Sequence, residues 1–338
     1  MEYRPLGRTG VHVSKLCLGT MMFGAWGNPD HDDSIRIIHR ALDAGVNFVD
    51  TADVYSAGES EEIVGKALKD RRDDVILATK FWGQMGEQPN RRGVSRRWII
   101  AEVESSLRRL GTDWIDLYQM HRPDPETDID ETLGALTDLV QQGKVRYIGS
   151  SSFSAGEIVE AQWAARERRF ERFRTEQPPY SILVRGIELD VLPTARRHGM
   201  GILTYSPLAG GWLSGSWGID SSPTSPARQR LAARFDMSLP ENQRKLEAVE
   251  QLAAVAGEAG VSLIELAIAF VANHPAVTSA IIGPRTMGQL DSQLPAADLA
   301  LDPAILDRID EVVQPGVNLN PADTSYGEQV LQAPLRRR

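Results

Sequence analysis

The sequence predicts an α/β fold in which the whole chain, residues 1–338, forms one (β/α)8 barrel domain. Strand-like and helix-like segments alternate eight times along the chain, which is typical of α/β folds. Each strand segment is closer to a continuous apolar run than to a strict alternation, as parallel strands buried on both faces require. A length of 338 residues lies within the range of such barrels once insertions are included.

The elements follow in order from their apolar spacing and turn residues. Residues 2–14 alternate around a turn from Gly7 to Gly10, which predicts a β-hairpin that covers one end of the barrel. Strands are predicted at residues 15–22, 47–52, 74–80, 115–121, 145–152, 173–177, 201–207 and 276–283. Helices are predicted from residue 32 to a stop at Gly45 and at residues 60–69, 97–110, 130–142, 154–166, 188–198, 241–259 and 262–272, with two additional C-terminal helices at residues 288–299 and 303–313. Residues 208–240 form a long Gly-, Ser- and Pro-rich connection, and loops of that length are uncommon unless they bind something.

Composition and charge exclude several classes of protein. Hydrophobic residues make up 42% and charged residues 25% of the chain, which is ordinary for a globular protein with a full core and excludes disordered and collagen-like classes. The net charge of -9 argues against a nucleic-acid-binding surface, since such surfaces are usually basic. No apolar run approaches the ~18 residues of a membrane helix, and the first residues lack the apolar region of a signal peptide. We therefore expect a cytoplasmic protein with no membrane or nucleic-acid partner.

Metal and nucleophile motifs are not evident in the sequence. Cys17 is the only cysteine, so we expect it to be a buried apolar side chain rather than part of a disulfide or a metal site. The histidines at positions 31, 39, 198 and 274 have no metal-ligand spacing, so no metal is expected. Nothing resembles the G-x-S-x-G motif of a serine nucleophile.

Four polar side chains follow three successive predicted strands. Asp50 ends the second strand, Tyr55 lies just beyond it, Lys80 ends the third and His121 ends the fourth. In a parallel barrel these strand ends meet at one face, and neighbouring strands are ~4.8 Å apart. A buried lysine needs a partner, so we expect an ion pair between Lys80 and Asp50.

Proton donation is the chemistry that these four side chains suggest. A tyrosine has an ordinary pKa of about 10, and a nearby ammonium from Lys80 favours its phenolate and makes Tyr55 a better acid. His121 is placed to hydrogen-bond an oxygen that is becoming an alkoxide. None of these groups can supply a hydride, so a reductant must bind. The alternative is a purely structural role, in which Asp50 and Lys80 form only an ion pair and the other two are hydrogen-bonded rim residues.

The strings DTADVY (50–55), ATK (78–80) and QMH (119–121) resemble the Asp, Tyr, Lys, His tetrad of the aldo-keto reductases. The resemblance extends over nearly the whole chain, from LGRTG to the last strand, and is to the bacterial type of the family, similar to the oxidoreductases related to potassium-channel beta subunits. It implies a (β/α)8 barrel that reduces a small-molecule carbonyl, or oxidises an alcohol, with a nicotinamide cofactor. In that scheme Tyr55 is the general acid, Lys80 and Asp50 tune it, and His121 orients the carbonyl.

The resemblance also implies a set of cofactor contacts. Ser151 and Gln177 match positions that hold the nicotinamide carboxamide, and Tyr205 matches the aromatic residue on which the nicotinamide stacks. Ser152 stands where the family usually has Asn, and Gln293 stands at another position that is often Asn. Residues 208–240 match the segment that covers the pyrophosphate, and Arg228, Arg230 and Arg234 give it local positive charge, although such a charge run can equally be a solvated surface. The expected cofactor contacts are Gly19, Thr20, Met21, Asp50, Ser151, Ser152, Gln177, Tyr205, Ser206, Pro207, Leu208, Gly210, Gly283, Arg285, Gln289 and Gln293.

The residues after the last strand bear on which cofactor is used. IIGPRTMGQ (281–289) predicts a strand, a glycine turn and a helix start, which offers backbone amides to an anion. Arg285 is suited to pair with a 2′-phosphate, so NADP(H) is favoured over NAD(H), although a solvated surface arginine is the alternative. No G-x-G-x-x-G follows a strand, so a Rossmann mode of binding is unsupported.

Three aromatic residues beyond strand ends, Phe23, Trp26 and Trp82, are candidates for the wall of an apolar substrate pocket, with core packing as the alternative. The hypothesis is therefore NAD(P)H-dependent reduction of an aldehyde or ketone. Two alternatives remain: a lyase that uses Lys80 as a Schiff-base nucleophile, and a regulatory subunit that binds the cofactor without significant turnover. The sequence leaves the particular substrate, the direction of reaction and the oligomeric state open.

Overall fold

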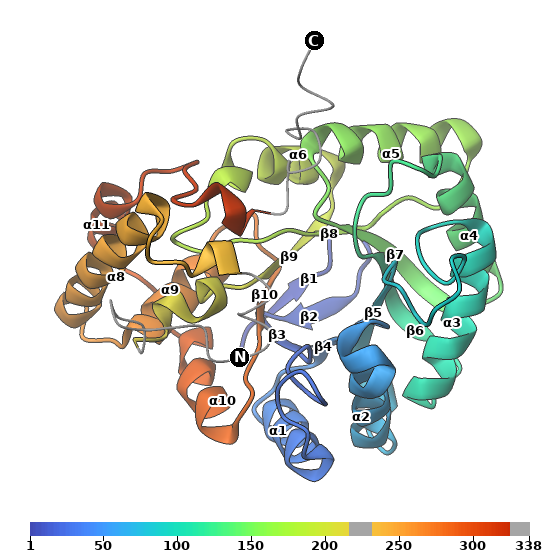
Figure 1. The fold of residues 1–338 in the computed structure, drawn as a ribbon, viewed down its shortest axis with the longest axis horizontal. Coiled ribbons are helices and arrows are strands. Elements are labelled where there is room, and N and C mark those ends of the chain that lie inside the picture. The colour runs from blue at the N-terminus through green and yellow to red at the C-terminus, as the bar shows by residue number, and fades with distance from the viewer. Residues whose placement is uncertain (216–231, 325–338) are drawn as a thin grey trace.

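Eight parallel strands close into a barrel in the computed structural model of this protein, which describes residues 1–215 and 232–324 (Figure 1). Around the barrel the strands follow the order β10, β3, β4, β5, β6, β7, β8 and β9, so the last strand pairs with the first. The strands are β3 (Leu16–Gly19), β4 (Phe48–Asp50), β5 (Ile76–Phe81), β6 (Ile115–Met120), β7 (Val145–Ser151), β8 (Thr175–Gln177), β9 (Gly201–Tyr205) and β10 (Ser279–Ile282). The predicted (β/α)8 barrel is confirmed.

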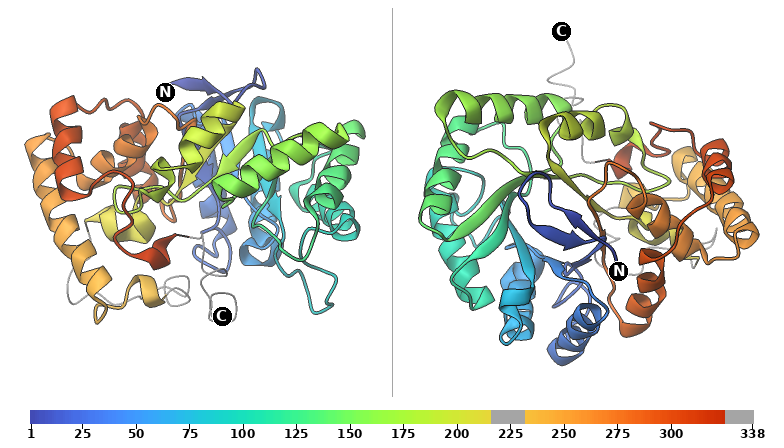
Figure 2. Two further views of the ribbon diagram at one scale, coloured as in Figure 1. Left: turned by 90° about the horizontal axis from the view of Figure 1, so that it is seen from above. Right: turned by 180° about the vertical axis from the view of Figure 1, so that it is seen from behind.

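The N-terminal hairpin lies across one end of this barrel, as predicted (Figure 2). Strands β1 (Tyr3–Pro5) and β2 (His12–Ser14) pair antiparallel, with Tyr3 opposite Ser14. Leu6 and Val13 of the hairpin are fully buried in one cluster with Cys17 and other residues inside the barrel, so the hairpin closes the N-terminal ends of the strands. Cys17 is a buried free thiol, as expected.

A ring of helices surrounds the strands (Figures 1 and 2). The helices are α1 (His31–Asp43), α2 (Glu59–Leu68), α3 (Arg96–Leu110), α4 (Ile129–Gln141), α5 (Ala155–Arg168), α6 (Val191–His198), α8 (Pro240–Glu258), α9 (Leu263–Ala272), α10 (Met287–Gln293) and α11 (Pro303–Val312). Both helices expected after the last strand are present. The first, α10, contacts α9 and α1 and so closes the ring, while α11 packs against α8.

Local sequence explains where many of these helices begin and end. Ser154 and Ser262 each form a capping box with a glutamate three residues later, which satisfies free amides at the start of α5 and α9. Gly111 and Gly199 end α3 and α6 in the left-handed conformation that glycine adopts without steric cost.

Several predicted elements, among them β3, β4 and β10, are shorter than the sequence suggested, and β9, α10 and α6 show where local structure sets the boundary. Strand β9 ends at Tyr205 rather than at residue 207, because Ser206 has a φ of 60° and cannot continue a strand. Helix α10 ends at Gln293 rather than at residue 299, because Pro295 lacks an amide hydrogen and opens a separate 3₁₀ turn at Leu294–Ala297. Helix α6 begins at Val191, after a 3₁₀ turn at Gly186–Glu188, rather than at residue 188.

The long connection after β9 is described only in part. Residues Ala209–Ser214 and Ala232–Arg234 form 3₁₀ turns, while Arg228 and Arg230 lie outside the described residues. Within the part of the chain that is described, no single helix is both long enough and apolar enough to cross a membrane. Among the described helices, only α8 and α9 taken together have that length and apolar composition, and the chain bends by 91° between them.

Candidate active site

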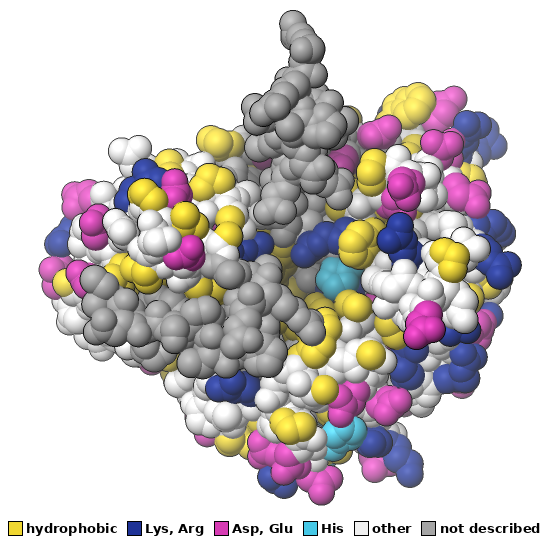
Figure 3. Space-filling view, in the orientation of Figure 1, with side chains coloured by type: hydrophobic (Ala, Val, Ile, Leu, Met, Phe, Trp, Pro, Cys, Tyr) yellow, Lys and Arg dark blue, Asp and Glu magenta, His cyan; other side chains and the backbone are white. Residues whose placement is uncertain are grey.

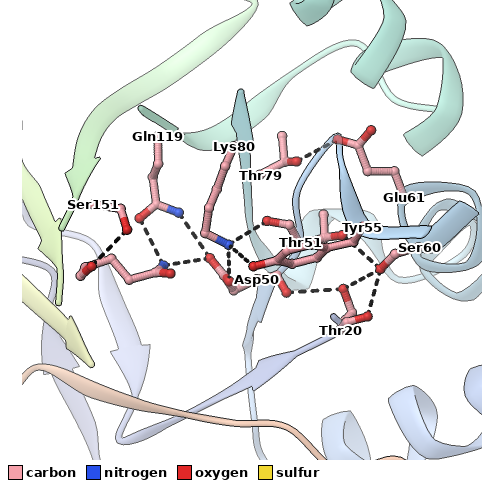
Figure 4. A network of polar contacts seen from close by, with 11 residues as sticks. Thr20, Asp50, Thr51, Tyr55, Ser60, Glu61, Thr79, Lys80, Gln119 and Ser151 are labelled. Carbon is pink, nitrogen blue, oxygen red and sulfur yellow. Dashed lines mark hydrogen bonds and ion pairs between the residues drawn. The ribbon is translucent and has the colours of Figure 1, made fainter. Parts of the chain in front are cut away.

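A buried ion pair lies where β4 and β5 end (Figure 4). The Lys80 ammonium donates to Asp50 Oδ1 at 2.5 Å, to the Thr51 carbonyl at 2.8 Å and to Tyr55 Oη at 3.3 Å. Lys80 is fully buried and the Asp50 side chain nearly so. The predicted pairing of Lys80 with Asp50 is therefore confirmed, and Tyr55 lies within hydrogen-bond reach of the same ammonium.

The second carboxylate oxygen of Asp50 is held by two amides. Gln119 Nε2 donates to Asp50 Oδ2 at 3.1 Å and Gln177 Nε2 donates to it at 2.9 Å. The sequence interpretation missed Gln119, although it stands beside Lys80 in the register between β5 and β6. Gln177, expected at the nicotinamide carboxamide, has its own amide turned toward Asp50. This carboxylate is thus surrounded by one cation and two amides.

Burial and charge act in opposite directions on Lys80 and Tyr55. Burial alone lowers the pKa of Lys80, but Asp50 and Tyr55 together outweigh burial and raise it above its ordinary value. Burial raises the pKa of Tyr55, and the nearby Lys80 ammonium only partly offsets that rise. The expectation that Lys80 makes Tyr55 more acidic is right for this one contribution and wrong for the sum. Tyr55 therefore keeps its proton near neutral pH, and Lys80 keeps its charge.

His121 packs edge-on against Tyr55, with 5.8 Å between ring centroids. Its backbone amide donates to the Phe81 carbonyl at 3.0 Å, which fixes the residue at the end of β6. Burial, followed by the positive charges of Lys80 and Arg122, lowers the pKa of His121 well below its usual value. His121 is therefore a neutral imidazole near neutral pH, with one nitrogen able to donate a hydrogen bond.

A network of hydroxyl groups holds the segment that carries Tyr55 (Figure 4). Ser60 Oγ lies 2.8 Å from Thr20 Oγ1 and 3.1 Å from Thr51 Oγ1, which ties the ends of β3 and β4 to α2. Tyr55 begins a 3₁₀ turn at Tyr55–Gly58 in which Ser56 and Ala57 have positive φ values of 48° and 57°. The sequence interpretation did not single out Ser56, whose positive φ leaves no mark in the sequence, and it took Ser60 only as the start of a helix.

The predicted nicotinamide contacts gather around the ends of β7, β8 and β9. Ser151 Oγ donates to the Gln177 carbonyl at 2.9 Å. Ser152, with a φ of 60°, accepts a hydrogen bond from Arg122 Nη1 and lies 3.3 Å from Tyr205 Oη. The sequence interpretation overlooked Arg122, which follows His121 directly.

The predicted adenosine contacts lie after β10. The side chain of Gln289 accepts from the Arg285 amide at 2.7 Å, and the Arg285 side chain is exposed. Gln293 is buried, and its side-chain oxygen has no hydrogen-bond partner among the described residues. A side chain at Gly283 would meet open space. An exposed cation and an unsatisfied buried acceptor fit a phosphorylated adenosine, which offers an anion and an amino group.

The other predicted contacts lie at the ends of β3 and β9. A Cβ atom at Gly19 would approach Ile281 Cγ2 to 2.7 Å, so only glycine fits beside β10 there. Thr20 is buried in the hydroxyl network, while Met21 is 42% exposed. Residues 206–208 and Gly210 follow β9 directly, and a Cβ atom at Gly210 would approach Phe235 to 3.1 Å.

The predicted substrate-pocket residues behave differently from one another. Phe23 is fully buried in the main core, so its assignment to a pocket wall is wrong and the packing alternative holds. The Trp26 ring lies 6.0 Å from that of Tyr55, and Trp82 is 37% exposed after the end of β5. In the space-filling view of this face, histidine, basic and hydrophobic side chains gather around a hollow near the middle (Figure 3).

Comparison with known proteins gives a consistent result over the whole barrel. A family model described as Aldo/keto reductase family matches residues 15–314. The chain is 42% identical over 323 residues to the Bacillus subtilis (strain 168) protein named Uncharacterized oxidoreductase YrpG, with 92% of this chain and 96% of that protein covered. It is 38% identical over 327 residues to the Probable voltage-gated potassium channel subunit beta of Arabidopsis thaliana, with 93% and 97% covered. It is also 38% identical over 297 residues to Aldo-keto reductase YhdN of Bacillus subtilis (strain 168), with 86% and 87% covered.

Proposed function

Because this chain belongs to the aldo/keto reductase family, we propose that it is an NADPH-dependent reductase that converts an aldehyde or ketone to an alcohol, with Tyr55 as the proton donor. The observation that carries the proposal is the contact of Tyr55 Oη, at 3.3 Å, with a fully buried ammonium that is itself held by a carboxylate. A purely structural ion pair does not need a phenol beside it. The family relation supports carbonyl reduction in general, and the geometry supports the particular roles.

The proton-transfer step follows from the charges around Tyr55. When bound, the nicotinamide supplies a hydride to the carbonyl carbon. Tyr55 Oη gives its proton to the carbonyl oxygen, and the Lys80 ammonium stabilises the phenolate left behind. Asp50 keeps that ammonium charged and fixed in position. Because Tyr55 has a raised pKa, it is fully protonated before each turnover.

His121 is proposed to orient the substrate rather than to supply a proton. Its lowered pKa leaves it neutral, so it offers one N–H to the carbonyl oxygen without adding a charge to the pocket. The edge-on packing of the two rings supports a contact of both side chains with one substrate oxygen. Two donors to one oxygen polarise the carbonyl and fix its face.

The cofactor preference is proposed from Arg285. Its guanidinium is exposed on the segment after β10, which also carries the buried acceptor of Gln293, and is suited to a 2′-phosphate. We expect Arg285→Met to weaken NADPH binding by at least about 10-fold and NADH binding much less, since one charge-assisted pair is lost. Fluorescence titration with each cofactor measures both dissociation constants. Equal weakening for the two cofactors would contradict the assignment.

The test of the proposed function follows NADPH absorbance with a panel of simple aldehydes. Wild-type protein should consume NADPH, and Tyr55→Phe should lose about 10²- to 10⁴-fold in turnover while it still binds cofactor. The matched control is Tyr147→Phe, which makes the same chemical change near the N-terminal end of β7. This position is away from the C-terminal strand ends that carry the site, so turnover should be retained. Full activity in Tyr55→Phe would contradict the role of Tyr55.

Two other functions lead to different outcomes of the same experiment. The similarity to a protein named potassium channel subunit beta favours a second candidate, a cofactor-binding regulatory subunit. NADPH binding without turnover of any carbonyl would support that candidate. A Schiff-base lyase needs a neutral lysine, whereas Lys80 has a raised pKa and binds Asp50 and Thr51, which argues against it. Covalent trapping of a carbonyl on Lys80 with borohydride would reverse that judgement.

A further inference from the structure

Arg122 lies beside the proposed reaction site and is only half-buried. It follows His121 at the end of β6, and its Nη1 donates to Ser152 Oγ at the end of β7. Its positive charge adds to the lowering of the His121 pKa, and it opposes the larger rise that burial causes in the Tyr55 pKa. The proposed mechanism assigns Arg122 no role.

The guanidinium of Arg122 has no carboxylate partner among the described residues. Arg72, Arg109 and Arg185 each have one, while Arg172, which is also partly buried, donates to two backbone carbonyls. Arg122 instead uses one of its five N–H donors on the neutral hydroxyl of Ser152. A half-buried guanidinium with one neutral acceptor keeps donors available for an anionic group of a ligand.

The nearby acid does not fill this role. Asp124, two residues later, accepts from the Glu126 amide at 3.0 Å and from Thr127 Oγ1 at 3.2 Å, which holds it in its own loop. Asp50 lies on the far side of Lys80 and its oxygens are already bound by Lys80, Gln119 and Gln177. Among the described residues, Arg122 therefore has one side-chain hydrogen bond, and none of its other N–H donors has an acceptor there that competes with a ligand.

We infer that this protein reduces carbonyl compounds that carry a negatively charged group, and that Arg122 binds this group while Tyr55 and His121 hold the carbonyl oxygen. The inference rests on the proposed reductase function. Arginine binds carboxylates and phosphates through two parallel hydrogen bonds, so the contact fixes the orientation of the substrate as well as its charge. Since Arg122 is adjacent to His121 in the chain, the anionic group is separated from the carbonyl by only a short spacer.

The test compares matched substrates in wild type and variants. The anionic probes are 4-oxobutanoate and glyceraldehyde 3-phosphate, and their neutral counterparts are butanal and glyceraldehyde. Wild type should have a higher kcat/KM for an anionic probe than for its neutral counterpart. The anionic probe with the larger ratio shows whether the site takes a carboxylate or a phosphate. In Arg122→Met that ratio should fall by at least about 30-fold, mainly through KM. Arg122→Lys should restore part of the ratio, since it keeps the charge but loses the two-pronged geometry.

The controls separate this inference from its rivals. Arg146→Met removes an exposed arginine at the other end of β7 and should leave the ratio unchanged. If Arg122→Met weakens NADPH binding and lowers kcat/KM equally for charged and neutral probes, Arg122 belongs to the cofactor site and the inference is overturned. Wild type could instead reduce each neutral probe as efficiently as its anionic counterpart. The inference about Arg122 would then be wrong, while the proposed reductase function would stand. If wild type binds NADPH but reduces no carbonyl, the proposed reductase function fails, and this inference fails with it.

Discussion

Asp50 is the last residue of β4 and Asp53 follows three residues later. Both side chains are buried, but their hydrogen-bond and charge partners differ. Asp50 lies inside the barrel and binds Lys80, Gln119 and Gln177. Asp53 is turned toward α2 and α3, where its carboxyl group has no side-chain hydrogen-bond partner among the described residues. One buried acid is fully compensated and the other is not.

The neighbours of Asp53 explain the contrast. Glu61 and Glu102 are also buried there, and Arg109 binds both of them, with Nε 2.6 Å from Glu61 and Nη2 2.5 Å from Glu102. Burial raises the pKa of Asp53 well above its usual value, and the charges of Glu61 and Glu102 raise it further. Three acids share one cation, so Asp53 is neutral near neutral pH. Pairing, rather than burial, decides which of the two aspartates can support a charged site.

The largest expected effect comes from removing the cation of the compensated site. Lys80→Met leaves the Asp50 carboxylate buried without an opposite charge, which should lower the free energy of unfolding by about 3–5 kcal/mol. Turnover should fall by about 10²- to 10⁴-fold, because Tyr55 loses the ammonium that stabilises its phenolate. Urea denaturation and NADPH-coupled turnover measure the two effects.

A second buried lysine provides the control for Lys80→Met. Lys245 is fully buried and pairs with Asp323 at 2.8 Å, away from Asp50 and Tyr55. Lys245→Met should destabilise the fold to a comparable degree and retain the chemical step. If both variants lose turnover equally, the effect at Lys80 is one of stability only.

The sequence was sufficient to predict the pairing of Asp50 with Lys80, but it predicted neither Gln119 nor the outer cluster, which consists of Asp53, Glu61, Glu102 and Arg109. Asp50 and Lys80 were predictable because the ends of neighbouring parallel strands meet whatever the details of the loops. The direction of Asp53 depends on the turn that follows, where two non-glycine residues adopt positive φ, and no sequence pattern specifies that. Phe23 was misassigned for the same reason, since its burial is decided by how the loop after β3 folds back.

Glu176 on β8 is a third buried carboxyl group, and among the described residues it has hydrogen-bond donors but no cation beside it. Ser150 Oγ donates to it at 2.5 Å and the Phe153 amide at 3.0 Å, yet burial raises its pKa to about 8. The folded protein keeps this proton while the unfolded chain loses it near pH 4.5, so stability falls as pH rises between those values. Gln at position 176 cannot titrate. The stability of Glu176→Gln relative to wild type should therefore rise by up to about 1.4 kcal/mol per pH unit over that range. Urea midpoints at pH 5, 6, 7 and 8 measure this, and parallel curves for the two proteins would contradict it.

Asp53→Asn and Asp50→Asn make the same chemical change on the two sides of the comparison. Because the pKa of Asp53 is raised, its contribution to stability is present at low pH and is lost as pH rises. Asp53→Asn should therefore match wild type at low pH and exceed it by about 1–3 kcal/mol at pH 8, with turnover retained. Asp50→Asn should lose turnover and stability. If Asp53→Asn is the more damaging of the two, the uncompensated description of Asp53 is wrong.

A change of similar size in stability, with none in turnover, is expected at Thr79, which precedes Lys80 on β5 and contacts Glu61 of the outer cluster. Its hydroxyl donates to Glu61 Oε1 at 2.6 Å, a hydrogen bond to a charged acceptor. Thr79→Val keeps the shape and removes the donor, so stability should fall by about 1.5–3 kcal/mol while turnover stays the same. Glu61→Gln also weakens the ion pair with Arg109, so a double-mutant cycle of Thr79→Val with Glu61→Gln is needed to isolate the coupling between Thr79 and Glu61. A change in turnover in Thr79→Val would mean that the Asp50–Lys80 pair and the outer cluster are coupled through β5. Asp50 and Asp53 would then not be in separate environments.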